Sequence, residues 1–479
     1  MRQADVVIYD MLVNPELLRL ARPAAELIPR GSRGETDALS QADLNLLLVR
    51  KAQEGKRVVR LKGGDPYVFG RGAEEAEELV AAGIPFEVVP GVSSIAAVPN
   101  YAGIPLTHRS YASAFTVLTG HEDPDKQSSD LDFKEIARIP GTKVILMGLK
   151  RLPVLVETLI AEGMSPDTPV AMVRWGTRGN QKSVEGTLAT ITHIATQQNI
   201  AAPAITIIGG VVKLRSRLNW FEQRPLFGRR VVVTRTRDQA SQLSQRLDEL
   251  GAEVLEIPTI RIAPSDRRED IVDALLELNS YDWLVFTSPN GVTSFFDLFF
   301  KRFQDLRDIG GVKIAAIGPA TAEKLRQLHL QVDVMPDEAL GSRVAAAINK
   351  FESVENLKIC LLRAQVANPD LPAELEALGA IVDDIAVYKT EPEQEDRTGS
   401  AAQLLKDGAD WITFTSASTV EHFHARFDLP RLRLQFPNVQ LASIGPETSK
   451  ALRALGLEPT VEAKVHTIEG VVGALLKNA

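Results

Sequence analysis

The sequence predicts an α/β fold of largely parallel sheets, divided among several domains. Short apolar runs such as VVIYD, RVVRL, FEVVP, KVILM and AITIIGG alternate with amphipathic stretches of helical period, the rhythm of βα units. A chain of 479 residues also exceeds what one hydrophobic core usually organises. Finally, the second half of the chain repeats itself, which indicates two similar lobes in series.

The composition limits the partners and the cellular location that we expect for this protein. The formal net charge is −8, whereas phosphate binding depends on clustered Lys and Arg, so we expect no nucleic-acid partner. No apolar stretch approaches the roughly 20 residues of a membrane span, and the first residues lack the apolar centre of a secretory signal. The single cysteine, Cys360, cannot form an internal disulfide. We therefore expect a cytoplasmic protein without membrane contacts.

A polar and aromatic segment around residues 214–230 marks the main domain boundary. It contains Pro225 and Gly228, and the apolar run VVVTR begins immediately afterwards. We place one domain at residues 1–222 and a second at 223–479.

The repeat in the second half has an offset of about 128 residues. VVVTR pairs with LKICLLR, DWLVFTSPNGV with DWITFTSASTV, and IAAIGPATAEKL with ASIGPETSKAL. In each copy one run ends in Thr-Ser and another in Ile-Gly-Pro ahead of a helical stretch. These hydroxyl residues can be helix caps, or they can belong to paired loops that clamp a large polar ligand.

Two segments of the first half carry glycine-rich turns. In RLKGGDPYVFGRG, residues 60–72, a strand runs into Gly63-Gly64-Asp65-Pro66, which is either a plain turn or a close approach to a ligand. In VVPGVSSIAAVPNYAGIPLTHR, residues 88–109, Pro90-Gly91 ends a predicted strand and Ser93-Ser94 begins a predicted helix.

These segments, with YDMLV, VILMGLK and PVAMVRWGT, resemble the uroporphyrinogen III C-methyltransferases of the tetrapyrrole methylase family over residues 1–222. The resemblance implies two α/β lobes, a homodimer, and S-adenosylmethionine held between the lobes as methyl donor. The donor contacts that it implies are Gly63, Gly64, Asp65, Val68, Ser93, Ser94, Met147, Gly176 and Ala204.

Asp10, in YDMLV, matches the family's proposed proton acceptor, and loss of a ring proton must accompany methylation of a pyrrole carbon. Its side chain could instead cap the helix predicted from Asn14-Pro15-Glu16. A substrate with eight carboxylates needs cations, and the candidates are Arg33, Arg71, His108 and Arg109, although most Arg side chains simply solvate a surface.

The sequence departs from the family pattern in two places. Ser32 stands where the family has a lysine proposed as proton donor, and Ser cannot carry that positive charge. The family's first strand and its GAGPGDP-type loop precede the residues that match the start of this sequence. Because that loop forms part of the donor site, we expect weak donor binding and poor methylation.

Residues 226–479 are similar to uroporphyrinogen III synthase through VVVTR, FTSPNGV, IGPATA, VYKT, FTSAST and IGPETSKAL. The resemblance implies lobes at 226–263 plus 391–479 and at 264–390, joined by two linking strands. It also implies closure of linear hydroxymethylbilane with inversion of the last pyrrole, without a cofactor. Seven His and one Cys show no metal-ligand spacing, so no metal is expected.

Tyr388 matches the family tyrosine near the leaving hydroxyl, although a tyrosine after a strand is often structural. Arg235 and Arg363 occupy equivalent repeat positions, and either could bind a carboxylate or close a salt bridge. The candidates for contacts with substrate carboxylates are Thr287, Ser288, Asn290, Thr321, Thr415, Ser416 and Thr448.

Together these resemblances predict a bifunctional enzyme of sirohaem or cobalamin biosynthesis that makes uroporphyrinogen III and methylates it toward precorrin-2. Two alternatives stay open. The synthase could be active alone with the first half as a scaffold, or the chain could be a tandem ligand-binding protein without chemistry.

Overall fold

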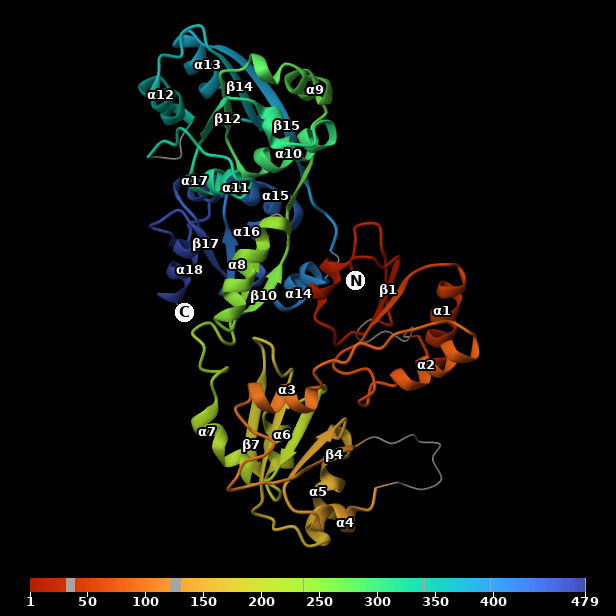
Figure 1. The fold of residues 1–479 in the computed structure, drawn as a ribbon. Coiled ribbons are helices and arrows are strands. Elements are labelled where there is room, and N and C mark those ends of the chain that lie inside the picture. Colours follow the sequence, from red (N-terminus) through yellow and green to blue (C-terminus); the bar gives the residue numbers. More distant parts are fainter. Residues whose placement is uncertain (32–38, 121–130, 236, 338–340, 397, 479) are drawn as a thin grey trace.

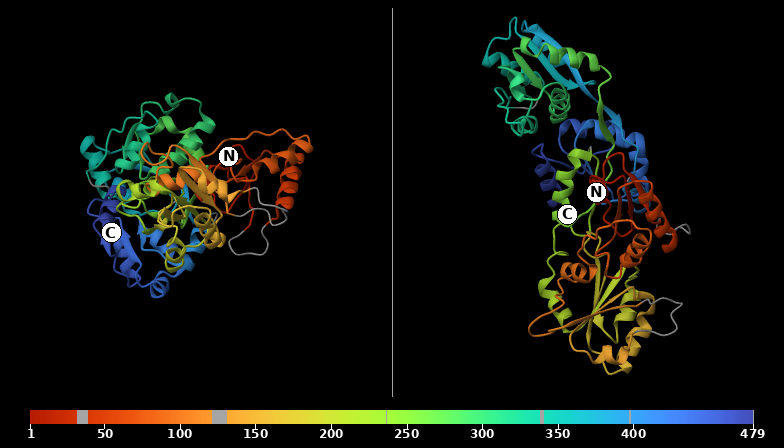
Figure 2. Two further views of the ribbon diagram at one scale, coloured as in Figure 1. Left: turned by 90° about the horizontal axis from the view of Figure 1, so that it is seen from below. Right: turned by 45° about the vertical axis from the view of Figure 1, so that its right-hand side comes forward.

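The computed structural model describes residues 1–31, 39–120, 131–235, 237–337, 341–396 and 398–478 (Figure 1). Its strands form four sheets, which confirms the predicted α/β class. Ser32 and Arg33, named above, lie outside the described residues. In Figures 1 and 2 the body containing β14 and β15 lies at one end of the molecule and the body containing β4 and β7 at the other.

The first sheet has three parallel strands in the order β2-β1-β3. Its central strand is the apolar run Val6–Tyr9, and Leu44 and Leu48 pack against one of its faces. The elements of this lobe are β1 (Val6–Tyr9), η1 (Pro15–Leu20), β2 (Glu26–Pro29), α1 (Gln41–Gln53), β3 (Val58–Leu61), α2 (Gly72–Ala81) and α3 (Ser94–Tyr101).

The second sheet is mixed, with the order β4-β5-β8-β6-β7. Helix α3 closes one face, where Ile95 and Val98 pack with Val173, Ile205 and Ile207. The elements are β4 (Phe115–Thr119), α4 (Phe133–Arg138), β5 (Thr142–Leu146), η2 (Leu149–Arg151), α5 (Leu152–Ala161), β6 (Pro169–Arg174), β7 (Lys182–Thr187), α6 (Ile191–Gln197), β8 (Ala204–Ile208), η3 (Gly210–Leu214) and α7 (Arg215–Leu218).

The second half contains the third and fourth sheets, of five strands each, in the orders β10-β9-β16-β17-β18 and β11-β15-β14-β12-β13. The third sheet and its helices comprise β9 (Arg230–Val233), α8 (Arg237–Glu249), β10 (Glu253–Glu256), α14 (Ser400–Asp407), β16 (Trp411–Phe414), α15 (Ala417–Phe427), α16 (Leu429–Gln435), β17 (Gln440–Ser443), α17 (Pro446–Ala454), β18 (Val461–Glu462) and α18 (Ile468–Leu476). The fourth comprises β11 (Ile260–Pro264), α9 (Arg268–Leu276), η4 (Leu278–Ser280), β12 (Trp283–Phe286), α10 (Pro289–Arg302), η5 (Leu306–Ile309), β13 (Lys313–Ala316), α11 (Pro319–Arg326), α12 (Gly341–Phe351), β14 (Lys358–Ala364), α13 (Asp370–Ala377) and β15 (Ile381–Pro392).

The internal repeat read from the sequence is present as a repeated strand order. The run β10-β9-β16-β17 corresponds to β15-β14-β12-β13. Asp410 accepts a hydrogen bond from the backbone N–H of Arg230 at 2.7 Å, and Asp282 accepts one from Lys358 at 2.8 Å. An equivalent aspartate therefore links the equivalent pair of strands in each lobe.

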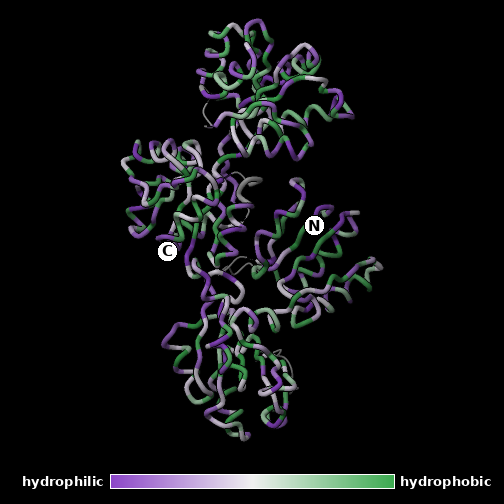
Figure 3. The backbone as a smooth tube through the Cα atoms, turned by 60° about the vertical axis from the view of Figure 1, so that its left-hand side comes forward, coloured by the Kyte–Doolittle hydropathy of each residue, from purple (hydrophilic) through white to green (hydrophobic). Residues whose placement is uncertain are grey.

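Strands β11 and β15 connect the two lobes. They pair antiparallel, from Ile260 opposite Pro392 to Pro264 opposite Tyr388. Residues 260–263 and 391–392, which the sequence-based division gave to the other lobe, thus pair within the fourth sheet. Hydrophobic and hydrophilic stretches alternate along the backbone in every part of the molecule (Figure 3).

One expected strand is absent. Residues 86–90, the run FEVVP, have no regular secondary structure, and Phe86 and Val89 are 43% and 69% exposed. The apolar and β-branched composition predicted a strand, but a strand also needs a hydrogen-bonding neighbour. Within the described residues this segment pairs with no strand of the first sheet.

The phenylalanines of α10 form the most aromatic core. Phe299 is fully buried and its ring contacts Phe295, Phe296 and Phe303, whereas the adjacent Phe300 is 44% exposed. We expect Phe299→Ala to lower the free energy of unfolding by about 3–5 kcal/mol because it leaves a cavity. Phe300→Ala, the matched control, should cost about 1 kcal/mol or less. Urea unfolding followed by far-UV circular dichroism measures both, and equal losses would contradict the assignment of this core.

Candidate functional site

The two glycine-rich turns of the first half lie against each other. Asp65 accepts hydrogen bonds from Tyr67 N at 2.9 Å and from Gly91 N at 3.0 Å, so its carboxylate joins the turn after β3 to the segment before α3. Gly63 and Gly64 stay exposed. The turn is therefore accessible rather than packed shut, as a ligand-binding loop requires.

A side chain at Gly91 would collide with the neighbouring turn. Its Cβ would lie 2.3 Å from the carbonyl oxygen of Gly64. We expect Gly91→Ala to separate the two turns and to weaken binding of S-adenosylmethionine by about tenfold or more, since binding sites tolerate little misplacement. Isothermal titration measures this effect. Gly473→Ala, where a Cβ meets open space, is the control and should bind as the wild type does.

Helix α3 links these turns to the second sheet. Ser93 is its N-cap, with Oγ accepting a hydrogen bond from Ile95 N at 3.3 Å, as the sequence predicted. The backbone of Gly176 packs on Val98 of the same helix, where an added Cβ would lie 2.5 Å from Cγ1. The segment that carries Gly176 therefore lies directly on the helix that begins at Ser94.

The remaining donor candidates gather at one edge of the second sheet. Met147 follows β5 directly, Gly176 follows β6 by one residue, and Ala204 begins β8, which runs antiparallel to both. In the sheet register Leu146 pairs with Ile205, and Arg174 pairs with Ala204. Met147 and Val68 are both exposed, at 53% and 39%. The donor candidates therefore lie in two regions, the glycine-rich turns and this edge of the second sheet, and α3 connects the two regions.

Asp10 ends the central strand of the first sheet. Its Oδ1 accepts a hydrogen bond from Arg60 Nη2 at 2.5 Å and lies 3.8 Å from Arg30 Nη1. The alternative that Asp10 caps the next helix is wrong, because Asn14 is the N-cap of η1 and accepts from Glu16 N at 3.0 Å. The carboxylate therefore faces the guanidinium groups of two arginines.

The candidate substrate cations are less organised. Arg71 occupies the left-handed N-cap of α2, and its guanidinium pairs with Glu74. His108 lies in a turn, where its Nδ1 accepts a hydrogen bond from Ser110 N at 3.1 Å, and Arg109 beside it is exposed. Substrate contact through these side chains stays a prediction.

In the second half Tyr388 meets two other candidates. Its hydroxyl lies 3.0 Å from Ser288 Oγ, and Ser288 caps α10 by accepting from Gly291 N at 3.0 Å. Burial raises the pKa of Tyr388, and hydrogen bonds with Ser288 and Asn290 oppose that rise. The phenol therefore holds its proton at neutral pH and can donate it. Sequence motifs a hundred residues apart form one cluster.

The other hydroxyl candidates divide into caps and buried groups. Ser416 caps α15 and forms a capping box with Thr419, while Thr415 beside it is half-buried. Thr321 and Thr448 lie in the first turns of α11 and α17 and are only 2% and 3% exposed. Contact of these hydroxyls with substrate stays a prediction.

Of the two equivalent arginines, Arg363 forms a salt bridge. It is 8% exposed, and its Nη2 lies 2.5 Å from Asp384 Oδ2. Arg235 also has a partner, and burial lowers the pKa of its guanidinium.

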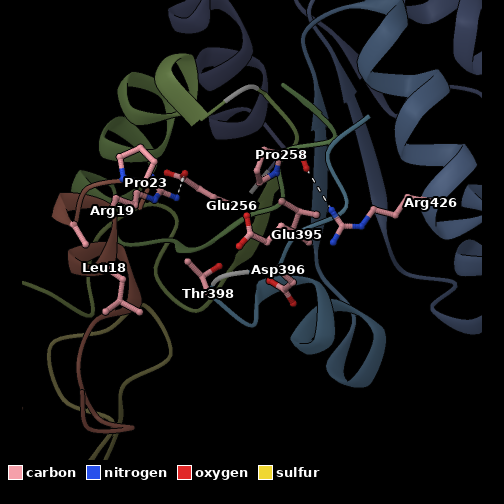
Figure 4. Close-up of a pocket in the computed structure, with 11 residues that line it drawn as sticks. Leu18, Arg19, Pro23, Glu256, Pro258, Glu395, Asp396, Thr398 and Arg426 are labelled. Carbon is pink, nitrogen blue, oxygen red and sulfur yellow. Dashed lines mark hydrogen bonds and ion pairs between the residues drawn. The ribbon is translucent and has the colours of Figure 1, made fainter. Parts of the chain in front are cut away.

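A cavity of about 290 Å³ between η1 and the third-sheet lobe was not predicted (Figure 4). Three acidic side chains, Glu256, Glu395 and Asp396, line it with two arginines, Arg19 and Arg426, and Arg19 pairs with Glu256. Arg426 donates to the carbonyl oxygens of Glu393 and Gln394. The acidic excess is unsuited to a polycarboxylate, and no predicted site residue lines this cavity.

Two features of the described residues bear on the class of site. Among the described residues, no group of three or more His, Cys, Asp or Glu side chains is arranged to hold a metal ion. Within the same ranges, none of the helices combines the length and the apolar character needed to traverse a lipid bilayer.

Both halves match known families. Residues 1–192 match the tetrapyrrole (corrin/porphyrin) methylases, and residues 241–473 match uroporphyrinogen-III synthase HemD. A porphyrin biosynthesis protein HemD of Ruminiclostridium josui is 37% identical over 99% of this chain and 93% of its own. The chain therefore belongs to the tetrapyrrole methylases through its first half and to the uroporphyrinogen-III synthases through its second.

Other relatives match smaller shares of the chain. The uroporphyrinogen-III C-methyltransferase of Bacillus subtilis is 37% identical over 75% of this chain and 72% of its own. An S-adenosyl-L-methionine-dependent uroporphyrinogen III methyltransferase of Methanosarcina barkeri is 52% identical over 46% of this chain and 86% of its own. The solved uroporphyrin-III C-methyltransferase of Thermus thermophilus, complexed with S-adenosyl homocysteine, is 36% identical, covering 44% of this chain and 89% of that chain with a TM-score of 0.38.

Proposed function

We propose that this protein performs two consecutive steps of tetrapyrrole biosynthesis. The second half closes hydroxymethylbilane to uroporphyrinogen III, and the first half methylates that product with S-adenosylmethionine toward precorrin-2. The observation that supports the methyl-transfer assignment most is the hydrogen bond from Gly91 N to Asp65, which joins two exposed glycine turns beside a carboxylate-bearing strand end. Residues of two separate motifs meet at this contact.

Asp10 is the proton acceptor in this proposal. A bound sulfonium donor supplies an electrophilic methyl group, and the methylated ring must then lose a proton. Arg30 and Arg60 hold the Asp10 carboxylate in one orientation at the end of β1. A general base must be held within reach of the proton that it removes, so these two contacts support this role.

Tyr388 is the proton donor in the ring closure. Breaking the bond between the hydroxymethyl carbon and its oxygen releases hydroxide, which leaves as water once the phenol has protonated it. An electrophilic azafulvene cation remains, and the terminal pyrrole attacks it. Ring closure with inversion ends with loss of a proton from the attacking pyrrole to the phenolate, which regenerates the phenol. Holding the bilane in the conformation that allows inversion is the larger part of the task.

One coupled assay tests both steps. The protein is incubated with hydroxymethylbilane, with and without S-adenosylmethionine carrying a labelled methyl group, and the products are separated by chromatography. We expect the type III isomer in both samples and label in the macrocycle in the second. Spontaneous type I closure would overturn the synthase assignment, and type III product without label would reduce the first half to a scaffold.

We also propose that the protein forms a homodimer through its first half. We further propose that it acts in the cytoplasm and binds no nucleic acid. The exposed apolar segment Phe86–Val92, including Val89 and Val92 at 69% and 74%, supports a contact between copies. The net charge of −8 supports the absence of nucleic acid. Sedimentation equilibrium tests the dimer, and a monomer at micromolar concentration would contradict it. The methylated product is a precursor for sirohaem or cobalamin.

A further inference from the structure

Asp10 belongs to a closed ring of polar side chains. Arg60 donates to Asp10 at 2.5 Å and lies 3.3 Å from Glu75, which accepts from Gln41 at 3.4 Å. Gln41 accepts from Arg30 at 3.0 Å, and Arg30 returns to within 3.8 Å of Asp10. The ring joins the ends of all three strands of the first sheet to helices α1 and α2.

Glu75 is the buried centre of this arrangement. Its side chain is 5% exposed and also accepts from Lys62 Nζ at 2.7 Å, while the Lys62 and Arg60 side chains are 4% and 10% exposed. Burial lowers the pKa of Lys62, and the Glu75 carboxylate opposes that effect. Without Glu75 two buried cations would lose their shared counter-charge, which is costly in a protein interior.

The same residue connects Asp10 to the glycine turn. Lys62 immediately precedes Gly63 in the chain, and Gly72 N, at the start of the helix that carries Glu75, donates to Pro66 O at 3.0 Å. Displacement of Glu75 would therefore disturb the turn and the carboxylate together. Most glutamates on helices are exposed to solvent, whereas Glu75 is buried among charged partners.

We propose that Glu75, acting through Arg60, is a positioning residue that fixes the orientation and charge of the Asp10 carboxylate for proton removal. The inference rests on the proposed methyl transfer. The charged groups around Asp10 are Arg30, Arg60, Lys62 and Glu75, which sum to two positive charges and, with the Asp10 carboxylate included, to one. Removal of Arg60 makes the surroundings of Asp10 less positive, and removal of the Glu75 charge makes them more positive.

The test compares the methyl-transfer pH–rate profiles of Arg60→Met and Glu75→Gln with that of the wild type. Loss of Arg60 removes a cation beside Asp10, so the acid limb should move to higher pH. Loss of Glu75 leaves the cations uncompensated, so the acid limb should move to lower pH. In both variants kcat should fall about 10–100-fold; KM for the donor should stay nearly unchanged in Arg60→Met and should rise in Glu75→Gln, because Glu75 also supports the glycine turn.

Two further variants separate this role from a structural one. Arg60→Lys keeps the charge and should restore the acid limb, and Glu78→Gln, an exposed carboxylate on the same helix, should behave as the wild type does. If Glu75→Gln does not fold, judged by circular dichroism, the two Arg60 variants decide the question. Unshifted acid limbs, or shifts in the same direction, would overturn the inference while the wild type still transfers methyl groups. A wild type without methyl transfer would overturn the proposed function, and this inference with it.

Discussion

Asp10→Asn is expected to reduce kcat for methyl transfer by about 10²–10⁴-fold, the range usual for loss of a general base. The amide is the same size as the carboxylate and can still accept from Arg60, so the sheet should keep its geometry. The amide cannot take up a proton at neutral pH. KM for the donor should change little, because the substitution removes a group needed after binding. Initial rates with a labelled methyl donor measure both constants.

Asp5→Asn is the matched control for this prediction. Asp5 is an aspartate at the opposite end of the same strand, where it pairs with Arg22 and accepts from Arg57 N at 2.7 Å. This substitution removes a carboxylate and an ion pair but should leave kcat near the wild-type value. If both variants lose activity equally, the effect of Asp10 is on the folding of β1 and the proton-acceptor role is wrong.

Local motifs were easier to predict from the sequence than pairings. Ser93 caps α3 as its sequence indicates, because an N-cap depends on residues within one turn. The segment Phe86–Pro90 was predicted as a strand from composition alone, yet whether a strand forms depends on a neighbour elsewhere in the chain. Local pattern therefore predicted helix caps, and it did not predict whether an apolar run would find the partner that a strand needs.

The ring of polar side chains that includes Asp10 and Glu75 shows the same limit of sequence-based prediction within the site. Glu74, Glu75, Glu77 and Glu78 look alike in the sequence, as acidic residues of a helix. Only the packing of α2 against β3 buries Glu75 against Arg60 and Lys62 and leaves Glu77 and Glu78 exposed. The helical position of Glu75 next to buried Ala76 was the one available signal, and periodicity alone cannot identify a charge partner.

Hydrogen bonds connect the first half of the chain to the third sheet. Asn180, four residues beyond Gly176, donates to Glu253 at 2.7 Å, and Arg230 Nε donates to the same carboxylate at 2.8 Å. Gly228 N also donates to Gly179 O at 2.9 Å. The segment that follows a donor candidate therefore touches the first two strands of the third sheet. Covalent fusion raises the local concentration of the shared intermediate for the second enzyme.

Tyr388→Phe is expected to slow formation of the type III isomer by about 10²-fold, the lower part of the range for loss of a general acid. The ring stays within the same hydrophobic cluster, and only the hydroxyl that lies 3.0 Å from Ser288 is lost. Without the acid, hydroxide must depart unassisted, and spontaneous closure to the type I isomer competes. Chromatography of the two isomers after a timed incubation measures the change in their ratio.

Tyr281→Phe separates chemistry from stability in that experiment. Tyr281 is 6% exposed and Tyr388 is 7% exposed, both belong to one cluster, and Tyr281 donates its single hydrogen bond to Asp383 at 2.7 Å. Each substitution should lower the free energy of unfolding by about 1–2 kcal/mol, since each removes a buried hydroxyl that is hydrogen-bonded. Only Tyr388→Phe should change the isomer ratio. Equal isomer ratios in the two variants would make the Tyr388 hydroxyl a structural group, and proton donation would then have to come from another residue of the cleft.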